Sequence, residues 1–227
     1  MRIMAKQSKK QSATSKTPSG PGSFQEEPVL SEFPASMRVP ELKLANHFLI
    51  AMPSMLDPMF GGSVVYMCEH NEEGALGVVI NRPTDMTIAD LFERIDLKLE
   101  IVPSNPDAAS AVLFGGPVQD DRGFVLHAPR GDYSSTLKVT DDIAFTTSRD
   151  VLEAVAAGSG PQQILISIGY CGWGAGQLED EISRNGWLTV AADRSILFDL
   201  PVAERYAAAI KLLGIDPIML VGEAGHA

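Results

Sequence analysis

The segment Asn81-Arg82-Pro83-Thr84 carries the side chains best suited to binding an anion. It follows an apolar run over residues 75–80 and precedes a helix that we expect to begin at Thr87. A guanidinium holds a carboxylate or phosphate through two parallel hydrogen bonds, and a helix N-terminus adds partial positive charge. The alternative is a structural turn in which Pro83 keeps Arg82 extended and Arg82 pairs with a nearby acid.

Two glycine-containing segments also follow apolar runs. In Gly115-Gly116-Pro117, the glycines permit either a close approach of backbone to a ligand or a turn with positive φ. The stretch from Gly169 to Glu179 holds four glycines, among them Gly174 and Gly176. A glycine-rich turn between a strand and a helix exposes backbone N–H groups that can bind an anion.

The second glycine-rich stretch admits other interpretations. Gln177 stands where a dinucleotide fingerprint beginning at Gly172 would need its third glycine, so we expect no nucleotide cofactor. Glu179, nearest the glycines at the start of the helix, is a candidate general base. The structural alternative is that the glycines let Trp173 pack tightly against the backbone.

Cys68 and His70 would share one face of a strand, where a thiol and an imidazole form a nucleophile and a base. The run from Val64 to Cys68 is apolar, however, and burial makes a thiol unreactive. His127 and Cys171 add two more ligand types, but no pair of the four has the spacing of a zinc finger. We therefore expect no metal and no cofactor.

Short apolar runs bounded by Gly, Pro, Asn or Asp predict the strands, and several are apolar throughout, which indicates burial on both faces. The predicted strands cover residues 47–51, 63–68, 75–80, 111–114, 123–127, 137–140, 143–146, 163–168 and 187–191. Helices are predicted from Thr87, from Ser148 to Gly158, from Gly174 to Arg184 and from Pro201 to Gly214. The irregular alternation of strands and helices favours an α+β fold.

Charge divides the 227 residues into a basic segment and an acidic remainder. Residues 1–40 carry six basic and three acidic side chains, whereas residues 41–227 carry twelve and twenty-six. Residues 1–23 contain no acid, many Ser and Thr, and too few apolar residues for a core. We predict a disordered basic N-terminal arm over residues 1–40 and a single domain over residues 41–227.

The same composition limits the partners and the compartment. The acidic domain should repel nucleic acid and anionic membranes, so direct DNA binding would depend on the basic arm. No apolar run is long enough to span a bilayer, and none near the start suits a signal peptide. A basic, Ser-rich start is also typical of an organellar transit peptide, but Lys dominates over Arg and no amphipathic period is present. We expect a cytoplasmic protein.

The motifs together resemble those of the YqgE/AlgH family over about residues 41–221. The matching stretches are Ala51–Met55, Asp57-Pro58, Ser63–Tyr66, Cys68–His70, Gly74–Gly77, Asn81–Pro83, Gly115–Val118, Gly123–His127, Gly169-Tyr170, Gly172–Glu179 and Trp187-Leu188. The resemblance implies an α+β fold in which a bifurcated β-sheet curls into a pseudo-barrel with packed helices. It also implies a link to a transcriptional regulator of exopolysaccharide synthesis, and it supplies no catalytic residues. Because the acidic domain has no helix-turn-helix signature, such regulation would be indirect.

Our leading hypothesis is a regulatory or small-anion-binding module that acts indirectly on gene expression, with a small anion or a protein as its partner. The predicted ligand-binding residues, which we expect to converge on one cleft, are Asn81, Arg82, Gly115, Gly116, Gly174, Gly176, Gln177 and Glu179. The first alternative is a hydrolase or transferase that uses Glu179 or Cys68. The second is a transcriptional regulator that binds DNA directly.

Overall fold

The computed structural model describes residues 43–98 and 111–214, all of which belong to the unit Leu42–Ala227. The predicted arm over residues 1–40 lies outside the described residues and stays a prediction. The described strands form one sheet of ten strands, whose main path runs β10-β1-β2-β3-β9-β6-β8-β7, with β4 paired to β5 and β5 to β9. No helix in the described segments has the length and hydropathy that a membrane span requires.

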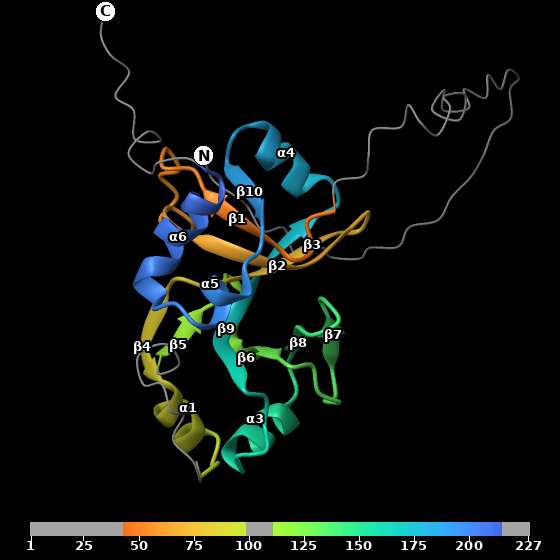
Figure 1. Ribbon diagram of the computed structural model, residues 1–227, viewed down its shortest axis with the longest axis vertical. Helices are drawn as coiled ribbons and strands as arrows, with labels where there is room; N and C mark the ends of the chain where they lie inside the picture. The colour runs from red at the N-terminus through yellow and green to blue at the C-terminus, as the bar shows by residue number, and fades with distance from the viewer. Residues whose placement is uncertain (1–42, 99–110, 215–227) are drawn as a thin grey trace, which may run out of the picture. The chain divides into compact units, whose positions relative to one another are not determined.

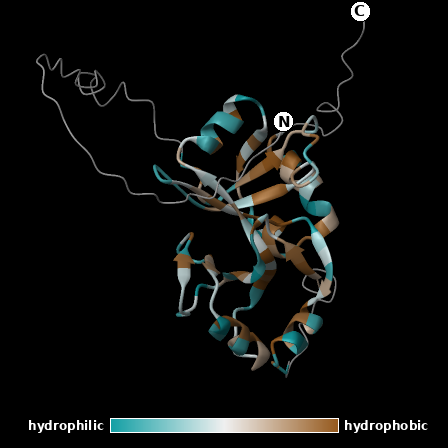
Figure 2. Cartoon of the chain, turned by 180° about the vertical axis from the view of Figure 1, so that it is seen from behind, coloured by the Kyte–Doolittle hydropathy of each residue, from teal (hydrophilic) through white to brown (hydrophobic). Residues whose placement is uncertain are grey.

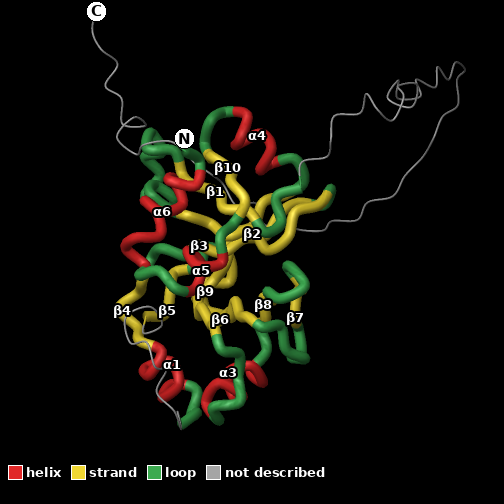
Figure 3. Tube along the Cα trace, in the orientation of Figure 1, coloured by secondary structure: helices red, strands yellow, loops and turns green. Residues whose placement is uncertain are grey.

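The elements follow the chain in the order shown in Figure 3. The strands are β1 (His47–Ala51), β2 (Val64–Asn71), β3 (Gly74–Val79), β4 (Pro83–Thr87), β5 (Ala111–Phe114), β6 (Val118–Ala128), β7 (Thr136–Lys138), β8 (Ala144–Thr146), β9 (Gln163–Gly174) and β10 (Trp187–Ala191). The helices are α1 (Ile88–Arg94), α3 (Arg149–Ala156), α4 (Gln177–Ser183), α5 (Arg194–Phe198) and α6 (Arg205–Leu212), with a 3-10 helix, η3 (Val202–Glu204).

The long strand β9 joins the two halves of the sheet (Figure 1). Its first part pairs with β6 and β5, and its last four residues, from Cys171 to Gly174, pair with β3. One strand therefore serves two sub-sheets that diverge from it. The predicted α+β fold, with a bifurcated and curled sheet and packed helices, is confirmed.

Three apolar clusters form the core. One contains residues from both sub-sheets together with α5 and α6, including Phe48, Leu126 and Leu197. A second packs α4 against β1, β2 and β3, and a third packs α1 and α3 against β5, β6 and β9. Several strands contact clusters on both faces, as predicted: in the apolar run from Val64 to Cys68, alternate residues lie in the first and the second cluster. In Figure 2 brown is concentrated in parts of the strands, whereas the helix α4 is mostly teal.

Several helix ends lie where the sequence predicts them. Thr87 caps α1: its Oγ1 accepts from Asp90 N at 3.1 Å, and Asp90 Oδ2 accepts from Thr87 N at 2.9 Å. These bonds to the Asp90 carboxylate hold its pKa below the usual range. Gly158 and Gly214 follow α3 and α6 with φ of 71° and 69°, which suits glycine after a helix.

Two elements were not predicted. The strand β4 alternates between exposed and half-buried residues, so its sequence contains no apolar run that would predict a strand. It forms because β5 pairs with it. The helix α5 is too short to show a helical period; Asp193 starts it by accepting from Ser195 N at 2.8 Å. Pro201 precedes the 3-10 helix η3 instead of lying in the first turn of α6.

Candidate functional site

Arg82 and Asn81 bind the loop that connects β1 to β2. Arg82 donates from Nη1 to Pro58 O at 3.0 Å and from Nη2 to Gly61 O at 2.7 Å. Asn81 donates from Nδ2 to Gly62 O at 2.8 Å. The guanidinium is thus held by two backbone carbonyls, in a structural role close to the alternative considered from the sequence, although its partners are carbonyls and not an acid.

This connecting loop, residues 52–63, exposes apolar side chains at its tip. Leu56 is 93% exposed and Met59 is 38% exposed. At its far end, the Phe60 ring packs edge-on against Trp187, with the ring centroids 5.6 Å apart. Asp57 stiffens the turn because its Oδ1 accepts from Met59 N at 2.8 Å and Phe60 N at 3.1 Å. Sequence reasoning placed Ala51–Met55 and Asp57-Pro58 among the matching family stretches but assigned this loop no binding role. Its signal was an apolar, Met- and Pro-rich run too broken to form a strand.

Gly115 and Gly116 are buried where the end of β5 crosses β9. A Cβ atom on Gly115 would lie 2.2 Å from Gly169 O, and one on Gly116 would lie 2.3 Å from Tyr170 O. Gly116 also has φ of 150°, which L side chains rarely adopt. The glycines do permit a close backbone approach, but the approaching backbone is that of β9.

The glycine-rich stretch beginning at Gly169 is part of a strand, so the predicted strand-to-helix turn is wrong there. Residues 169–174 continue β9, and Gly174 pairs with Gly74 of β3. The helix begins only at Gln177, after Gly176 with φ of 72°. Gln177 Oε1 accepts from Gly174 N at 3.1 Å. Pairing with β3 places residues 171–174 in the sheet, and this bond occupies the amide of Gly174.

Glu179 joins α4 to β2. Its Oε1 lies 2.8 Å from His70 Nε2, and His70 Nδ1 accepts from Leu44 N at 3.2 Å. Since Nδ1 accepts, Nε2 carries the proton and donates to the carboxylate. The His70 side chain is 3% exposed and that of Glu179 is 46% exposed. Glu179 therefore anchors a buried imidazole, and its role as a general base stays a prediction.

Two of the three predicted segments lie side by side, but Gly174 lies apart from them. Phe114 N donates to Arg82 O at 2.8 Å, and Val79 N donates to Gly115 O at 2.8 Å. Arg82 follows one end of β3, whereas Gly74, at the other end, pairs with Gly174. From Gly74 to Val79 the strand β3 rises about 17 Å, at about 3.4 Å per residue. The single-cleft arrangement is therefore wrong, although ligand binding by the individual residues stays a prediction.

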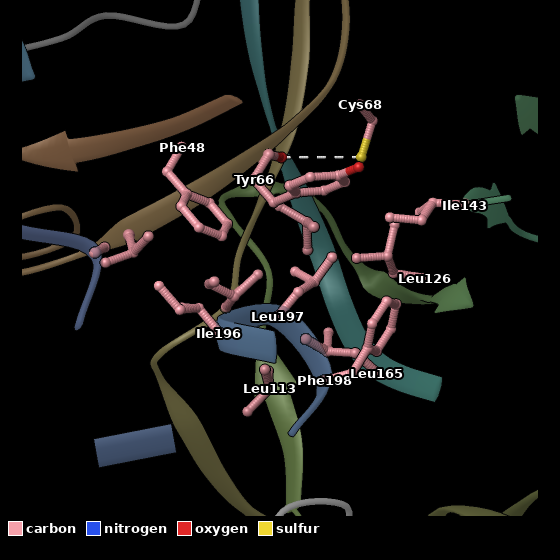
Figure 4. Packing of buried hydrophobic residues seen from close by; sticks show 14 of the residues in the cluster. Phe48, Tyr66, Cys68, Leu113, Leu126, Ile143, Leu165, Ile196, Leu197 and Phe198 are labelled. Carbon is pink, nitrogen blue, oxygen red and sulfur yellow. Dashed lines mark hydrogen bonds between the residues drawn. The ribbon is translucent and has the colours of Figure 1, made fainter. Parts of the chain in front are cut away.

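Cys68 lies beside Tyr66 in the first apolar cluster, as Figure 4 shows. The residue is 2% exposed, and burial raises the pKa of its thiol well above the usual range. Its Sγ contacts Tyr66 O at 3.9 Å, and among the described residues it has no hydrogen bond to a histidine. Cys171 is also buried, and burial raises its thiol pKa too. These observations argue against the thiol version of the enzyme hypothesis.

Glu181 gathers both tryptophans of the chain, and sequence reasoning missed it. Trp173 Nε1 and Trp187 Nε1 each donate to Glu181 Oε2 at 2.9 Å, and Gln177 Nε2 donates to Oε1 at 2.9 Å. The two indoles lie edge to face, with ring centroids 6.2 Å apart. The available signal was the pair of tryptophans flanking an acidic helix. The arrangement fixes α4 on the sheet.

His127 belongs to a buried polar chain in the other half of the sheet. Its Nε2 lies 2.8 Å from Thr146 Oγ1, its Nδ1 lies 3.3 Å from Pro129 O, and Thr146 Oγ1 lies 2.9 Å from Thr136 Oγ1. Burial lowers the pKa of His127 because the charged imidazolium loses its hydration.

We expect His127 to make the folded domain less stable as the pH falls below about 6.5. Above that pH the imidazole is neutral in both states, and below it the unfolded chain takes up the proton first. The destabilisation can reach about 1.4 kcal/mol per pH unit until the folded pKa is passed. Urea unfolding of the wild type and of His127→Gln checks this. The stability advantage of the wild type should shrink between pH 7 and pH 5, and a constant difference would contradict the prediction.

Two pockets lie on the surface, and the first borders the glycine-rich stretch through Gly172 and Trp173. The first, about 320 Å³, has Glu69, Asn71 and Glu73 in its lining and lies over β2, β3 and β9. Its carboxylates disfavour an anion. The second, about 260 Å³, contains the Asp142–Arg194 ion pair. Within residues 43–98 and 111–214, no three His, Cys, Asp or Glu side chains gather closely enough to hold a metal ion.

Comparison with known proteins identifies the family. The AlgH-like family matches residues 48–218. A UPF0301 protein of Cupriavidus metallidurans is 65% identical over 186 residues, which are 82% of this chain and 96% of that protein. One from Bordetella petrii is 63% identical over 188 residues, covering 83% and 92% of the two chains.

Solved structures agree with this assignment. The solution structure of the AlgH protein from Pseudomonas aeruginosa is 50% identical, with a TM-score of 0.65, and the match covers 84% of this chain and 99% of that one. A Corynebacterium diphtheriae protein that is 20% identical, with a TM-score of 0.57, shares the fold. The chain therefore belongs to the AlgH-like family.

Proposed function

We propose that this protein is a cytoplasmic regulatory module that binds a protein partner through the tip of the loop at residues 52–63 and acts on gene expression only indirectly. The observation that carries the proposal is Leu56, which is 93% exposed on a loop fixed by side-chain hydrogen bonds. A loop whose backbone is already fixed loses little conformational entropy when a partner covers the apolar side chain at its tip.

The construction of the loop supports a binding role. Arg82 and Asn81 bind its carbonyls from outside, and within the loop Gly61 N donates to Asp57 O at 2.7 Å. Met59 extends the apolar tip beside Leu56, and methionine adapts well to a partner's surface. These features suit a preformed knob that enters an apolar pocket on another protein.

The other hypotheses have less support. The thiol of Cys68 is buried, with a raised pKa, and Glu179 is engaged with His70. Residues 41–227 carry twelve basic and twenty-six acidic side chains, which opposes contact with DNA. An effect on transcription would therefore pass through the protein partner.

Replacing Leu56 with lysine should abolish capture of the partner without affecting folding. A hot-spot side chain contributes about 2 kcal/mol or more to binding, so the affinity should fall at least about thirtyfold. The melting temperature should stay unchanged because the side chain contacts little else in the domain. The measurement is affinity capture from host extract with the full chain, followed by titration of the captured protein.

Leu212→Lys is the matched control. Leu212 is the other exposed leucine of the described residues, 39% exposed in the last turn of α6, where a lysine suits the helix dipole. A protein retained by the wild type and by Leu212→Lys but lost from Leu56→Lys would support the proposal. Equal capture by all three chains would overturn it.

Anion binding at the end of β3 is the second candidate. Arg205 is 1% exposed, donates from Nη1 to Ile80 O at 2.7 Å, and has its pKa lowered to about 10 by burial. Within the described segments, neither it nor Arg82 forms an ion pair. A thermal-shift titration with inorganic phosphate tests this candidate, which needs a shift in the wild type that Arg82→Gln removes.

A further inference from the structure

The strand β10 forms one end of the sheet and pairs on one side only, with β1. The register of this pair shows which of its backbone groups point outward. Ala192 N donates to Asn46 O at 3.0 Å and Met52 N donates to Gly186 O at 3.1 Å. The even-numbered residues of the strands β1 and β10 therefore form the hydrogen-bonded pairs. The N–H and C=O groups of Trp187, Thr189 and Ala191 therefore face away from β1.

These outward groups have no hydrogen-bond partner among residues 43–98 and 111–214. The strand also lacks the features that normally protect an edge, since Trp187–Ala191 contains no proline and no charged residue. The opposite end of the sheet differs: β7 has only three residues, and one of them is Lys138. An uncharged, unpaired edge of five residues is a template for a further strand.

We propose that this edge pairs with β10 of a second copy of the chain, antiparallel and about a two-fold axis at Thr189. In that register Thr189 faces Thr189 of the second copy, and Trp187 faces Ala191. All six outward groups on each strand then find partners, which gives six hydrogen bonds. A two-fold interface requires a self-complementary surface, and a strand whose outward groups are centred on one residue supplies it.

Charge at the two ends of the strand neither favours nor opposes this pairing. Arg184, just before β10, forms an ion pair with Asp180 at 2.8 Å, and Arg194, just after it, forms one with Asp142. In the proposed register Arg184 lies near both Arg194 and Asp193 of the second copy, and each guanidinium already has a carboxylate of its own chain as partner.

The size of the contact sets the expected strength. A stable dimer buries about 1,200 to 2,000 Å², and pairing two five-residue strands buries less. The loop at residues 52–63 borders the Trp187 end of the edge, because Phe60 packs on Trp187, and it can add apolar area. We therefore expect a reversible dimer with a dissociation constant on the order of micromolar.

Sedimentation equilibrium of the full chain tests the proposal. The average mass should rise across the micromolar range from 24.3 kDa toward twice that value. Thr189→Pro removes an outward N–H and no bond to β1, so it should weaken the dimer at least about tenfold with little change in melting temperature. Thr189→Ala is the matched control and should dimerise like the wild type, because it keeps the N–H. Ala191→Pro removes a different outward N–H donor and replaces Thr189→Pro in the measurement if Thr189→Pro folds poorly.

Every other result contradicts the pairing of β10 with a second copy of the chain. A wild type that stays monomeric at high micromolar concentration overturns the proposal. If the wild type is monomeric and the Thr189→Pro variant has a lower melting temperature than the wild type, the edge is covered by another segment of the same chain. A dimer that Thr189→Pro and Ala191→Pro leave intact forms through a different surface, and this too overturns the proposal.

Discussion

Gly116→Ala is expected to destabilise the folded domain by more than about 4 kcal/mol. The added Cβ would lie 2.3 Å from the carbonyl carbon and oxygen of Tyr170, and alanine disfavours the φ of 150°. The obstacle is backbone within the strand β9, so no side-chain rotation relieves it. Because whole domains are stable by about 5–15 kcal/mol, much of the variant should fail to fold. Soluble yield and urea unfolding measure the effect.

Gly123→Ala provides the control in β6. A Cβ at Gly123 would meet nothing within 4 Å, so its effect should stay within about 0.5 kcal/mol. The pair also separates two roles for Gly116. A Gly116→Ala variant that folds with normal stability would contradict the packing role and return this glycine to the candidates for ligand contact.

Glu181→Ala is expected to cost about 3 kcal/mol and to change the tryptophan emission. Trp173 and Trp187 are 7% and 4% exposed, and each would lose the acceptor for its Nε1 proton. An unsatisfied buried donor costs about 1–3 kcal/mol, and two are created at once. The two indoles are the only tryptophans of the chain, so the emission reports on this site alone. Urea unfolding and the emission maximum of the folded protein are the measurements.

Glu179→Ala is the control on the same helix. Its carboxylate is 46% exposed and has one described partner, so we expect a loss of about 1 kcal/mol or less and little change in emission. Equal effects of the two substitutions would show that the indole contacts contribute nothing specific. Unchanged stability in Glu181→Ala would contradict the role assigned to Glu181.

Local patterns predicted most of the elements. Short apolar runs located nine of the ten described strands, and the Thr87–Asp90 capping box marked the start of α1. These signals are local, because a strand or a cap depends on residues a few positions apart. Prediction failed where the secondary structure depends on a distant segment. The strand β4 forms because β5 pairs with it. The glycines at the end of β9 pair with β3 instead of forming a loop.

The candidate site depended on contacts between distant segments. The His70–Glu179 pair joins residues 109 positions apart, and Arg82 reaches back 21 positions to Gly61. A sequence shows that Arg82 can donate hydrogen bonds, but not which acceptors the fold brings to it. The same holds for Glu181, whose indole partners Trp173 and Trp187 come from two different strands.

The sequence by itself determined the fold class, the family resemblance, the acidic charge of the domain and the positions of most strands and helices. The charge follows from composition, the elements and the fold class follow from short local patterns, and the resemblance rests on the motifs that the chain carries. Only the tertiary structure decided that Gly116 meets β9, that Leu56 is exposed on a braced loop, and that Thr189 lies on an open edge. Each of these depends on strand order and register, which are set by the packing of the whole sheet and not by any one segment.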